Sequence, residues 1–236
     1  NDFDLSLRSS PHYEYFKYSN DNNGTANYYP VDLQIDLGNI CNSACLTCDE
    51  NHSTLIGGLK SKTYPIVDNS NAFWQLPLSR VVHLDISGGE PSHSKNYKHI
   101  LANLPLNIKS IRLNTNCSTV LEELWDLCYR GVHVTVTVSL DGIGPVHDLV
   151  RWPVKWDNFW ANLQRYMEMP VRLNTWTTVS ALNIDDLPNI LQFVKEHNLD
   201  HSYAYLKEPV ELAVENKNTP EFLAYIQKQK QLRGIE

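Results

Sequence analysis

The sequence of 236 residues lacks an apolar run long enough to span a bilayer, and its start lacks the basic-then-apolar pattern of a secretory signal. It also lacks a basic excess, since 20 Lys and Arg stand against 27 Asp and Glu, a net charge of −7. Proteins that bind nucleic acids or anionic membranes usually need a basic surface. We therefore expect neither partner. The chain opens on Asn1 rather than Met, so we expect a natural N-terminus further upstream.

Cysteine is scarce and unevenly placed. The chain has five cysteines, an odd number, and none follows Cys128. Three of them fall within eight residues, which is not the spacing of a disulfide framework. We expect a cytoplasmic protein from a reducing compartment, with a metal site at the clustered cysteines.

From Val31 onward, strand-like and helix-like runs alternate, which is typical of a parallel sheet or barrel. The pattern predicts strands over 31–37, 80–87, 108–114, 132–140, 170–179 and 200–206. It predicts helices over about 93–103, 119–130, 155–168 and 184–197, with a last helix from Pro220. Residues 53–79 are interrupted by glycine and proline and give no clear pattern.

Several expected strands have one polar face. In 132–140, valines alternate with His133, Thr135, Thr137 and Ser139. Parallel strands buried on both faces are usually apolar throughout, so the polar face must line a wet or ligand-filled interior while helices cover the other. We predict an α/β fold with a partial (β/α)6 TIM-like barrel. The alternative is an antiparallel sheet with one face in water.

The same pattern suggests three parts of the chain. Residues 1–30, rich in Asp, Asn, Ser and Tyr, are expected to form an N-terminal extension. Residues 31–207 are expected to form the barrel core, and residues 208–236 a C-terminal extension with a helix.

The clustered cysteines are Cys41, Cys45 and Cys48, spaced C-x3-C-x2-C just after the first expected strand. Three thiolates on one loop can bind one soft metal centre, and three would leave one iron of a [4Fe–4S] cube open. His52 could instead complete a Cys3His zinc site. A redox pair of Cys45 and Cys48 is a third reading, but it leaves Cys41 unexplained.

A second motif, Gly88-Gly89-Glu90-Pro91, ends the second expected strand. Glycines let a ligand approach the backbone closely, and the exposed backbone groups with the Glu90 carboxylate suit a ligand carrying an amine and a carboxylate. An ordinary Gly-Gly turn is the simpler interpretation of this motif alone.

Together the two motifs resemble those of the radical S-adenosylmethionine (radical SAM) enzymes, which carry them in the same order after the first and second strands. The resemblance covers about residues 31–207, and more weakly Leu232-Arg233-Gly234. Further matching segments are Leu113-Asn114-Thr115-Asn116, Ser139-Leu140-Asp141-Gly142, His147-Asp148, Arg151, Thr178-Val179 and Asn183-Ile184. The pattern is most similar to SPASM/twitch-type members that modify peptides or mature cofactors.

The resemblance implies a [4Fe–4S] cluster on Cys41, Cys45 and Cys48 whose open iron chelates the methionine part of SAM. Reductive cleavage of SAM would then give a 5′-deoxyadenosyl radical that abstracts hydrogen from a substrate. The residues that the resemblance places at the cofactor are Thr47, Gly88, Gly89, Glu90, Asn116, Ser139, Arg151 and Val179. Val179 would lie against the adenine, and an electron donor such as flavodoxin or ferredoxin is implied.

The chain departs from the family pattern at three points. Thr47 stands where an aromatic residue often precedes the third cysteine, and Cys117 replaces a glycine. Cys117 is a candidate hydrogen-atom donor, although a small structural residue is the simpler interpretation. Because no cysteine follows Cys128, no auxiliary cluster can be ligated there.

Polar side chains on the expected inner face are candidate substrate contacts, and they favour a polar small molecule or peptide. They are Asp36, His83, Asp85, Arg112, Asn174, Trp176, Tyr203, Tyr205 and Lys207. Two alternatives to a self-sufficient enzyme are a zinc-stabilised binding domain without catalysis and a radical SAM subunit that acts only with a partner.

Overall fold

The computed structural model describes Lys17, Asp21, Asn23 and residues 30–235. The expected N-terminal extension over 1–30 therefore lies almost wholly outside the described residues. Within the described part of the chain, no helix combines the length and the apolar character needed to cross a membrane.

The strands form one parallel sheet of six, in the order in which they occur along the chain. They are β1 (Asp32–Asp36), β2 (His83–Ser87), β3 (Ser110–Thr115), β4 (His133–Ser139), β5 (Arg172–Val179) and β6 (Asp200–Tyr205). This confirms the predicted partial (β/α)6 barrel, and the antiparallel alternative is wrong. Each predicted strand overlaps an observed one.

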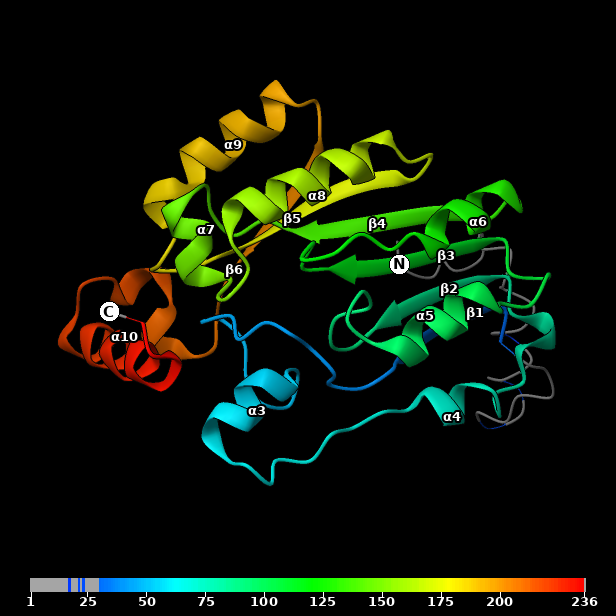
Figure 1. Ribbon diagram of the computed structural model, residues 1–236, viewed down its shortest axis with the longest axis horizontal. Coiled ribbons are helices and arrows are strands. Elements are labelled where there is room, and N and C mark those ends of the chain that lie inside the picture. Colours follow the sequence, from blue (N-terminus) through cyan, green and yellow to red (C-terminus); the bar gives the residue numbers. More distant parts are fainter. Residues whose placement is uncertain (1–16, 18–20, 22, 24–29, 236) are drawn as a thin grey trace.

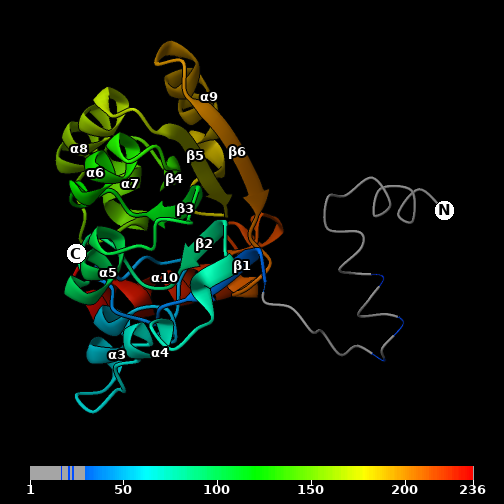
Figure 2. The ribbon, with the colours of Figure 1, turned by 90° about the vertical axis from the view of Figure 1, so that its right-hand side faces the viewer.

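Helices lie between successive strands and cover one face of the sheet, and a last helix follows β6 (Figure 1). They are α3 (Thr54–Lys60), α4 (Ser70–Phe73), α5 (Lys95–Ala102), α6 (Glu123–Tyr129), α7 (Pro145–Val150), α8 (Trp156–Glu168), α9 (Leu187–Glu196) and α10 (Pro220–Arg233). Figure 2 shows the sheet curving, with α5, α6 and α8 outside the curve. The short helices α3, α4 and α7 were not predicted, because α3 and α4 fall in the segment 53–79 that glycine and proline interrupt, and the six residues of α7 are too few to show a period.

The last helix, α10, has both of its ends encoded locally. The hydroxyl of Thr219 accepts a hydrogen bond from the Phe222 amide at 3.2 Å, and Pro220 occupies the first turn. Gly234 ends the helix in the left-handed conformation, with φ of 64°. The predicted start at Pro220 is confirmed.

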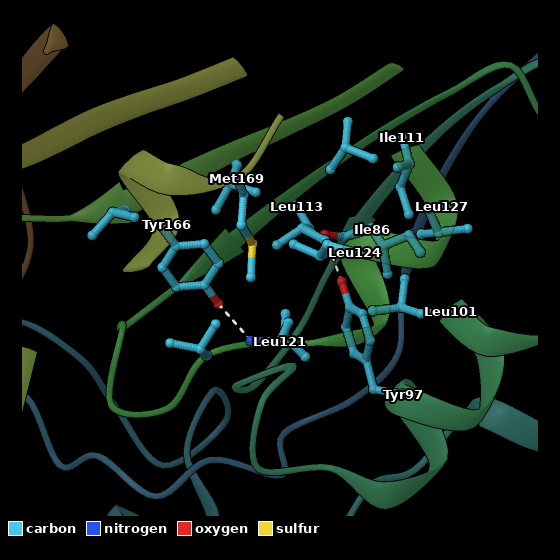
Figure 3. Close-up of a cluster of buried hydrophobic side chains, with 14 of the residues drawn as sticks. Ile86, Tyr97, Leu101, Ile111, Leu113, Leu121, Leu124, Leu127, Tyr166 and Met169 are labelled. Atoms are coloured by element: carbon cyan, nitrogen blue, oxygen red, sulfur yellow. Dashed lines mark hydrogen bonds between the residues drawn. The ribbon is translucent and has the colours of Figure 1, made fainter. Parts of the chain in front are cut away.

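The main core lies between the sheet and its helices (Figure 3). On this side Val136 and Val138 of β4 are fully buried. Two tyrosines in the core form hydrogen bonds between their hydroxyl groups and backbone atoms. Tyr97 donates to the Ile86 carbonyl at 3.3 Å, and Tyr166 accepts from the Leu121 amide at 3.0 Å.

The opposite face of the sheet is polar, as expected, and is called the lumen below. Strand register places one row of side chains across five strands: Gln34, Asp85, Arg112, Thr135 and Arg172. A cavity of about 530 Å³ opens on this face over β1 to β4.

Candidate cofactor site

The three clustered cysteines lie on the loop after β1, called the cysteine loop (residues 41–48), and all three line one cavity of about 370 Å³. Side chains at the start of α3 hold this loop. The Ser53 hydroxyl donates to the Ser43 carbonyl at 2.5 Å. The Thr54 hydroxyl both donates to the Cys41 carbonyl and accepts from the Cys41 amide.

The Gly-Gly-Glu turn packs against residues 36–40, which lead into this loop. Gly88 and Gly89 have φ of 97° and 58°, a region that favours glycine. A Cβ atom would lie 2.3 Å from an Asp36 carboxylate oxygen at Gly88 and 2.2 Å from the Ile40 carbonyl oxygen at Gly89. The glycines therefore permit close approach of the protein's own backbone, and both also line the cavity.

Glu90 is buried and ties the end of β2 to the end of β3. Its Oε1 atom accepts from the Ser92 amide, the Ser92 hydroxyl and the Thr115 hydroxyl at 3.0, 2.6 and 2.8 Å. Its Oε2 atom accepts from the Asn116 amide at 2.6 Å. Since a carboxylate oxygen has about two acceptor sites, Oε2 is the atom with capacity left for a ligand amine.

The Asn116 side chain continues this connection to the cysteine loop. Its amide nitrogen donates to the Asn42 side-chain oxygen at 2.9 Å and to the Ser43 hydroxyl at 2.7 Å. Its side-chain oxygen accepts from the Ser118 amide at 2.9 Å. The polar atoms of the Asn116 side chain are therefore already bonded to the protein, and their main role is to hold the wall of the cavity.

Arg151 brings a buried positive charge to the same cavity from the end of α7. Its Nη1 atom donates to Asp141 at 3.1 Å, and the two side chains are 13% and 2% exposed. Burial raises the pKa of the Asp141 carboxyl, while the Arg151 charge opposes that shift. The Nε atom of Arg151 is buried without a partner, which fits an anionic ligand group such as a carboxylate.

The protein environment alone does not ionise the cysteines. Burial raises the pKa of the Cys41 thiol to about 12 and that of Cys48 to about 11, and it also raises the pKa of Cys45. Thiolates are the form that binds metal, so a cationic centre must supply the stabilisation that burial removes.

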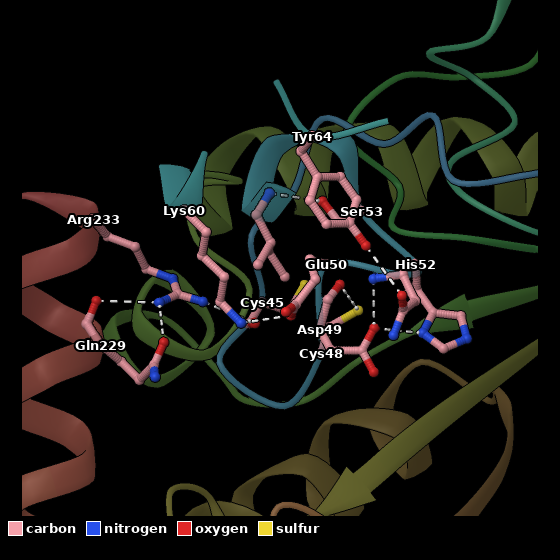
Figure 4. A network of polar contacts seen from close by, with 12 residues as sticks. Cys45, Cys48, Asp49, Glu50, His52, Ser53, Lys60, Tyr64, Gln229 and Arg233 are labelled. Atoms are coloured by element: carbon pink, nitrogen blue, oxygen red, sulfur yellow. Dashed lines mark hydrogen bonds and ion pairs between the residues drawn. The ribbon is translucent and has the colours of Figure 1, made fainter. Parts of the chain in front are cut away.

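The position of His52 does not support a zinc site. His52 lines the same cavity as the cysteines, but its Nδ1 atom lies 2.8 Å from an Asp49 oxygen (Figure 4), and its side chain is 66% exposed. Zinc needs four donors within about 2.0–2.3 Å of one point. Across residues 30–235, no three His, Cys, Asp or Glu side chains are arranged as ligands to a single ion. The three cysteines therefore share a cavity with His52, but the structure does not arrange the four side chains as a zinc site.

A comparison with models of protein families matches residues 35–194 to the radical SAM superfamily. The chain belongs to this superfamily. The family uses a [4Fe–4S] cluster and SAM, and the donor set described above fits both. No curated protein matches the chain by sequence.

Solved structures support the same radical SAM fold. SuiB of Streptococcus suis bound to precursor peptide SuiA is 16% identical, with a TM-score of 0.57 over 94% of this chain and 51% of SuiB. The anSMEcpe structure with bound AdoMet is 18% identical, with a TM-score of 0.58 over 88% and 63%. Coproporphyrinogen III oxidase (HemN) of Escherichia coli is 15% identical, with a TM-score of 0.54 over 87% and 52%. The chain spans about half the length of SuiB.

The structure brings most of the predicted radical SAM residues together. Those that line the cavity are Cys41, Cys45, Cys48, Gly88, Gly89, Glu90, Asn116, Ser139 and Arg151, and Asp36, which was predicted as a substrate contact, lines it as well. Thr47 and Val179 are not among the lining residues. Val179 is fully buried and alternates with the luminal residues of β5, so its side chain faces away from the lumen.

Cys117 also lies outside the cavity. Its side chain is fully buried in the hydrophobic core, with its sulfur 3.7 Å from the Phe159 carbonyl oxygen. The structure therefore favours a small core residue over a hydrogen-atom donor. Its φ of 59° lies in the region that favours glycine, the residue that the resemblance implies at this position.

Of the other candidate substrate residues, four line cavities on the luminal face, Trp176 shares that face, and three lie elsewhere. His83, Asp85 and Arg112 line the 530 Å³ luminal cavity, and Arg112 and Asn174 line an adjoining one of about 430 Å³. Trp176 is in register with Ser139 and shares the luminal face.

The prediction of a luminal position is wrong for Tyr203 and Tyr205. They are in register with Thr177 and Val179, on the opposite face of the sheet. A one-residue offset changes the face of every side chain, and β6 has no apolar alternation to fix it from sequence. Lys207 lies beyond the end of β6 and lines neither luminal cavity.

Several site residues were missed. Ser87 and Asn114 line the cofactor cavity, and their alternation in β2 and β3 could have identified them. Ser43 also lines it, and its place between Cys41 and Cys45 in the cysteine motif could have identified it. Arg233 of α10 contacts the cysteine loop from 188 residues further along the chain, and only the weak resemblance of the tail pointed to it.

Proposed function

We propose that this chain is the catalytic barrel of a radical SAM enzyme with a single [4Fe–4S] cluster. The observation that carries the proposal is one cavity lined by three thiols, a Gly-Gly-Glu turn and a buried guanidinium at the carboxyl ends of a parallel sheet. Barrels of this kind place their active sites at that end.

Each group has a role that follows from its position. Cys41, Cys45 and Cys48 would hold three irons. The free capacity of Glu90 Oε2 and the Gly88–Gly89 backbone suit the amine of SAM. Arg151, with its unpartnered Nε atom, suits the carboxylate.

The cluster and SAM, when bound, supply an electron and a 5′-deoxyadenosyl radical that abstracts hydrogen. The protein's contribution is to orient SAM and to keep water from the reacting atoms. Ser139, the last residue of β4, and Trp176 of β5 are neighbours on the luminal face, and so mark the region where a substrate would meet the cofactor.

We further propose a peptide or a polar small molecule as substrate. The lumen carries charged groups, including the Asp85–Arg112 pair at 2.9 Å, which suit a polar ligand. SuiB was solved with a precursor peptide and anSMEcpe with a peptide, which supports this substrate class and the SPASM-type resemblance. Reduction would come from a donor of the flavodoxin or ferredoxin class.

Anaerobic reconstitution tests the proposal. We expect brown protein with about four irons per chain, and cleavage of SAM to 5′-deoxyadenosine after reduction. Replacing Cys41, Cys45 and Cys48 together by alanine should abolish both, whereas Cys128→Ala, on helix α6, should change neither. Colourless protein that holds one zinc would contradict the proposal and support the non-catalytic binding domain. An intact cluster without SAM cleavage would instead indicate a partner-dependent subunit.

A further inference from the structure

Helix α10 contacts the cysteine loop through one buried side chain, Arg233 (Figure 4). The residue is only 6% exposed. Its Nε atom donates to the Ala44 carbonyl at 2.7 Å, and its Nη2 atom donates to the Cys45 carbonyl at 3.2 Å. Two successive carbonyls of the loop are thus held by one guanidinium.

The guanidinium is itself fixed from behind. Its Nη1 atom donates to the Gln229 carbonyl at 3.1 Å and to the Gln229 side-chain oxygen at 2.7 Å, one turn earlier in α10. Because all three nitrogens of this planar group are hydrogen-bonded, the side chain can adopt few other conformations. It therefore fixes the position of the loop relative to α10.

The charge of this group also matters. Arginine remains protonated in proteins. Reduction adds an electron to a metal centre, and a nearby buried positive charge stabilises the reduced form more than the oxidised form. Arg233 bonds the carbonyl of Cys45, which is itself a predicted ligand.

We propose that Arg233 is a positioning residue that holds the cysteine loop in shape and biases the centre bound there toward its reduced state. The inference rests on the proposed function for its redox part, while the contact with the loop stands on the geometry alone. It extends the site to α10, outside the 35–194 segment that matches the family model.

The test uses three variants of the full chain. Arg233→Gln removes the positive charge and the guanidinium group that bonds two carbonyls. Arg233→Lys keeps the charge but cannot bond both carbonyls in the same way. Arg165→Gln, which removes a surface charge of α8, is the control. Amide hydrogen exchange of residues 41–48 is measured on iron-free protein. The fraction of reduced cluster at fixed potential is measured on reconstituted protein by electron paramagnetic resonance.

We expect exchange in residues 41–48 to rise about tenfold in Arg233→Gln, to rise less in Arg233→Lys, and to stay unchanged in Arg165→Gln. We expect the ratio of reduced to oxidised cluster to fall about threefold in Arg233→Gln and to be largely retained in Arg233→Lys. Exchange unchanged in Arg233→Gln overturns the positioning role. A reduced fraction equal to that of wild type overturns the electrostatic role. Wild-type protein that binds no iron refutes the proposed function, yet the exchange measurement still decides the contact.

Discussion

His147 of α7 should make the fold sensitive to mild acid. It is fully buried, and neither ring nitrogen has a partner. The centroid of its ring lies 4.4 Å from the ring centroid of Phe159 and 5.6 Å from that of Trp156. Burial lowers the pKa of His147 to about 3; the Arg151 charge adds to this shift and Asp148 opposes it.

The sign and size of the effect follow from linkage. A histidine in the unfolded chain has a pKa of about 6.5, so between pH 6.5 and 3 the unfolded state binds a proton that the folded state does not. Stability is therefore lost as pH falls below about 6.5, at up to about 1.4 kcal/mol per pH unit. At pH 5 this one residue should cost about 2 kcal/mol relative to pH 7.5.

Urea unfolding of iron-free protein, followed by tryptophan fluorescence, measures the effect. We expect His147→Asn to be less stable than wild type at pH 7.5, because it leaves a gap between the aromatic rings. The same variant should lose about 2 kcal/mol less than wild type between pH 7.5 and 5. His99→Asn, at an exposed position, serves as control and should keep the wild-type pH dependence.

Equal pH dependence in wild type and His147→Asn would refute this reasoning. So would a His147 ring that titrates near neutral pH in the folded protein, as followed by nuclear magnetic resonance of labelled histidine. Either result would mean that water reaches the ring or that a partner forms on protonation.

Three further substitutions test the site. Glu90→Gln should lower stability by about 1–3 kcal/mol in thermal unfolding, because its NH₂ group would face either the Asn116 amide or the donors at Oε1; unchanged stability would contradict the described network. Arg151→Lys keeps the charge but loses the fork, so SAM should bind about tenfold more weakly by calorimetry, and full affinity would exclude a direct contact. Cys117→Gly should change SAM cleavage less than about twofold, since its thiol faces the core and glycine suits the backbone there; loss of cleavage with an intact cluster would restore its catalytic candidacy.

The sheet was readable from the sequence because its two faces differ. Valines of β4 alternate with polar residues, and that period gives both the strand and its orientation. The orientation of β6 was mispredicted, because Tyr203 and Tyr205 lie on the outer face of the sheet yet remain about half exposed. An edge strand without a covered apolar face carries no signal of orientation.

The cofactor residues were readable for a different reason. The cysteines, the Gly-Gly-Glu turn and Arg151 belong to local motifs, and a motif identifies its own members. Local sequence does not show which groups already have partners. Glu90 and Asn116 are bonded chiefly to the protein, and only the folded contacts reveal it.

The cysteine loop is shaped mainly by contacts with distant parts of the chain. Its Ala44 and Leu46 amides donate to the carbonyls of Trp152 and Val150, after β4, at 2.7 and 2.9 Å. The end of β3 contacts the loop through Asn116, and α10 contacts it through its last turn.

A loop held in this way cannot take its final shape before the surrounding sheet has formed. The thiols are then brought to one cavity only in the folded barrel, where burial disfavours their ionised form. Correct placement and ionisation therefore have different sources. The fold supplies the arrangement of the sulfurs, and the metal centre supplies the positive charge that makes them ligands.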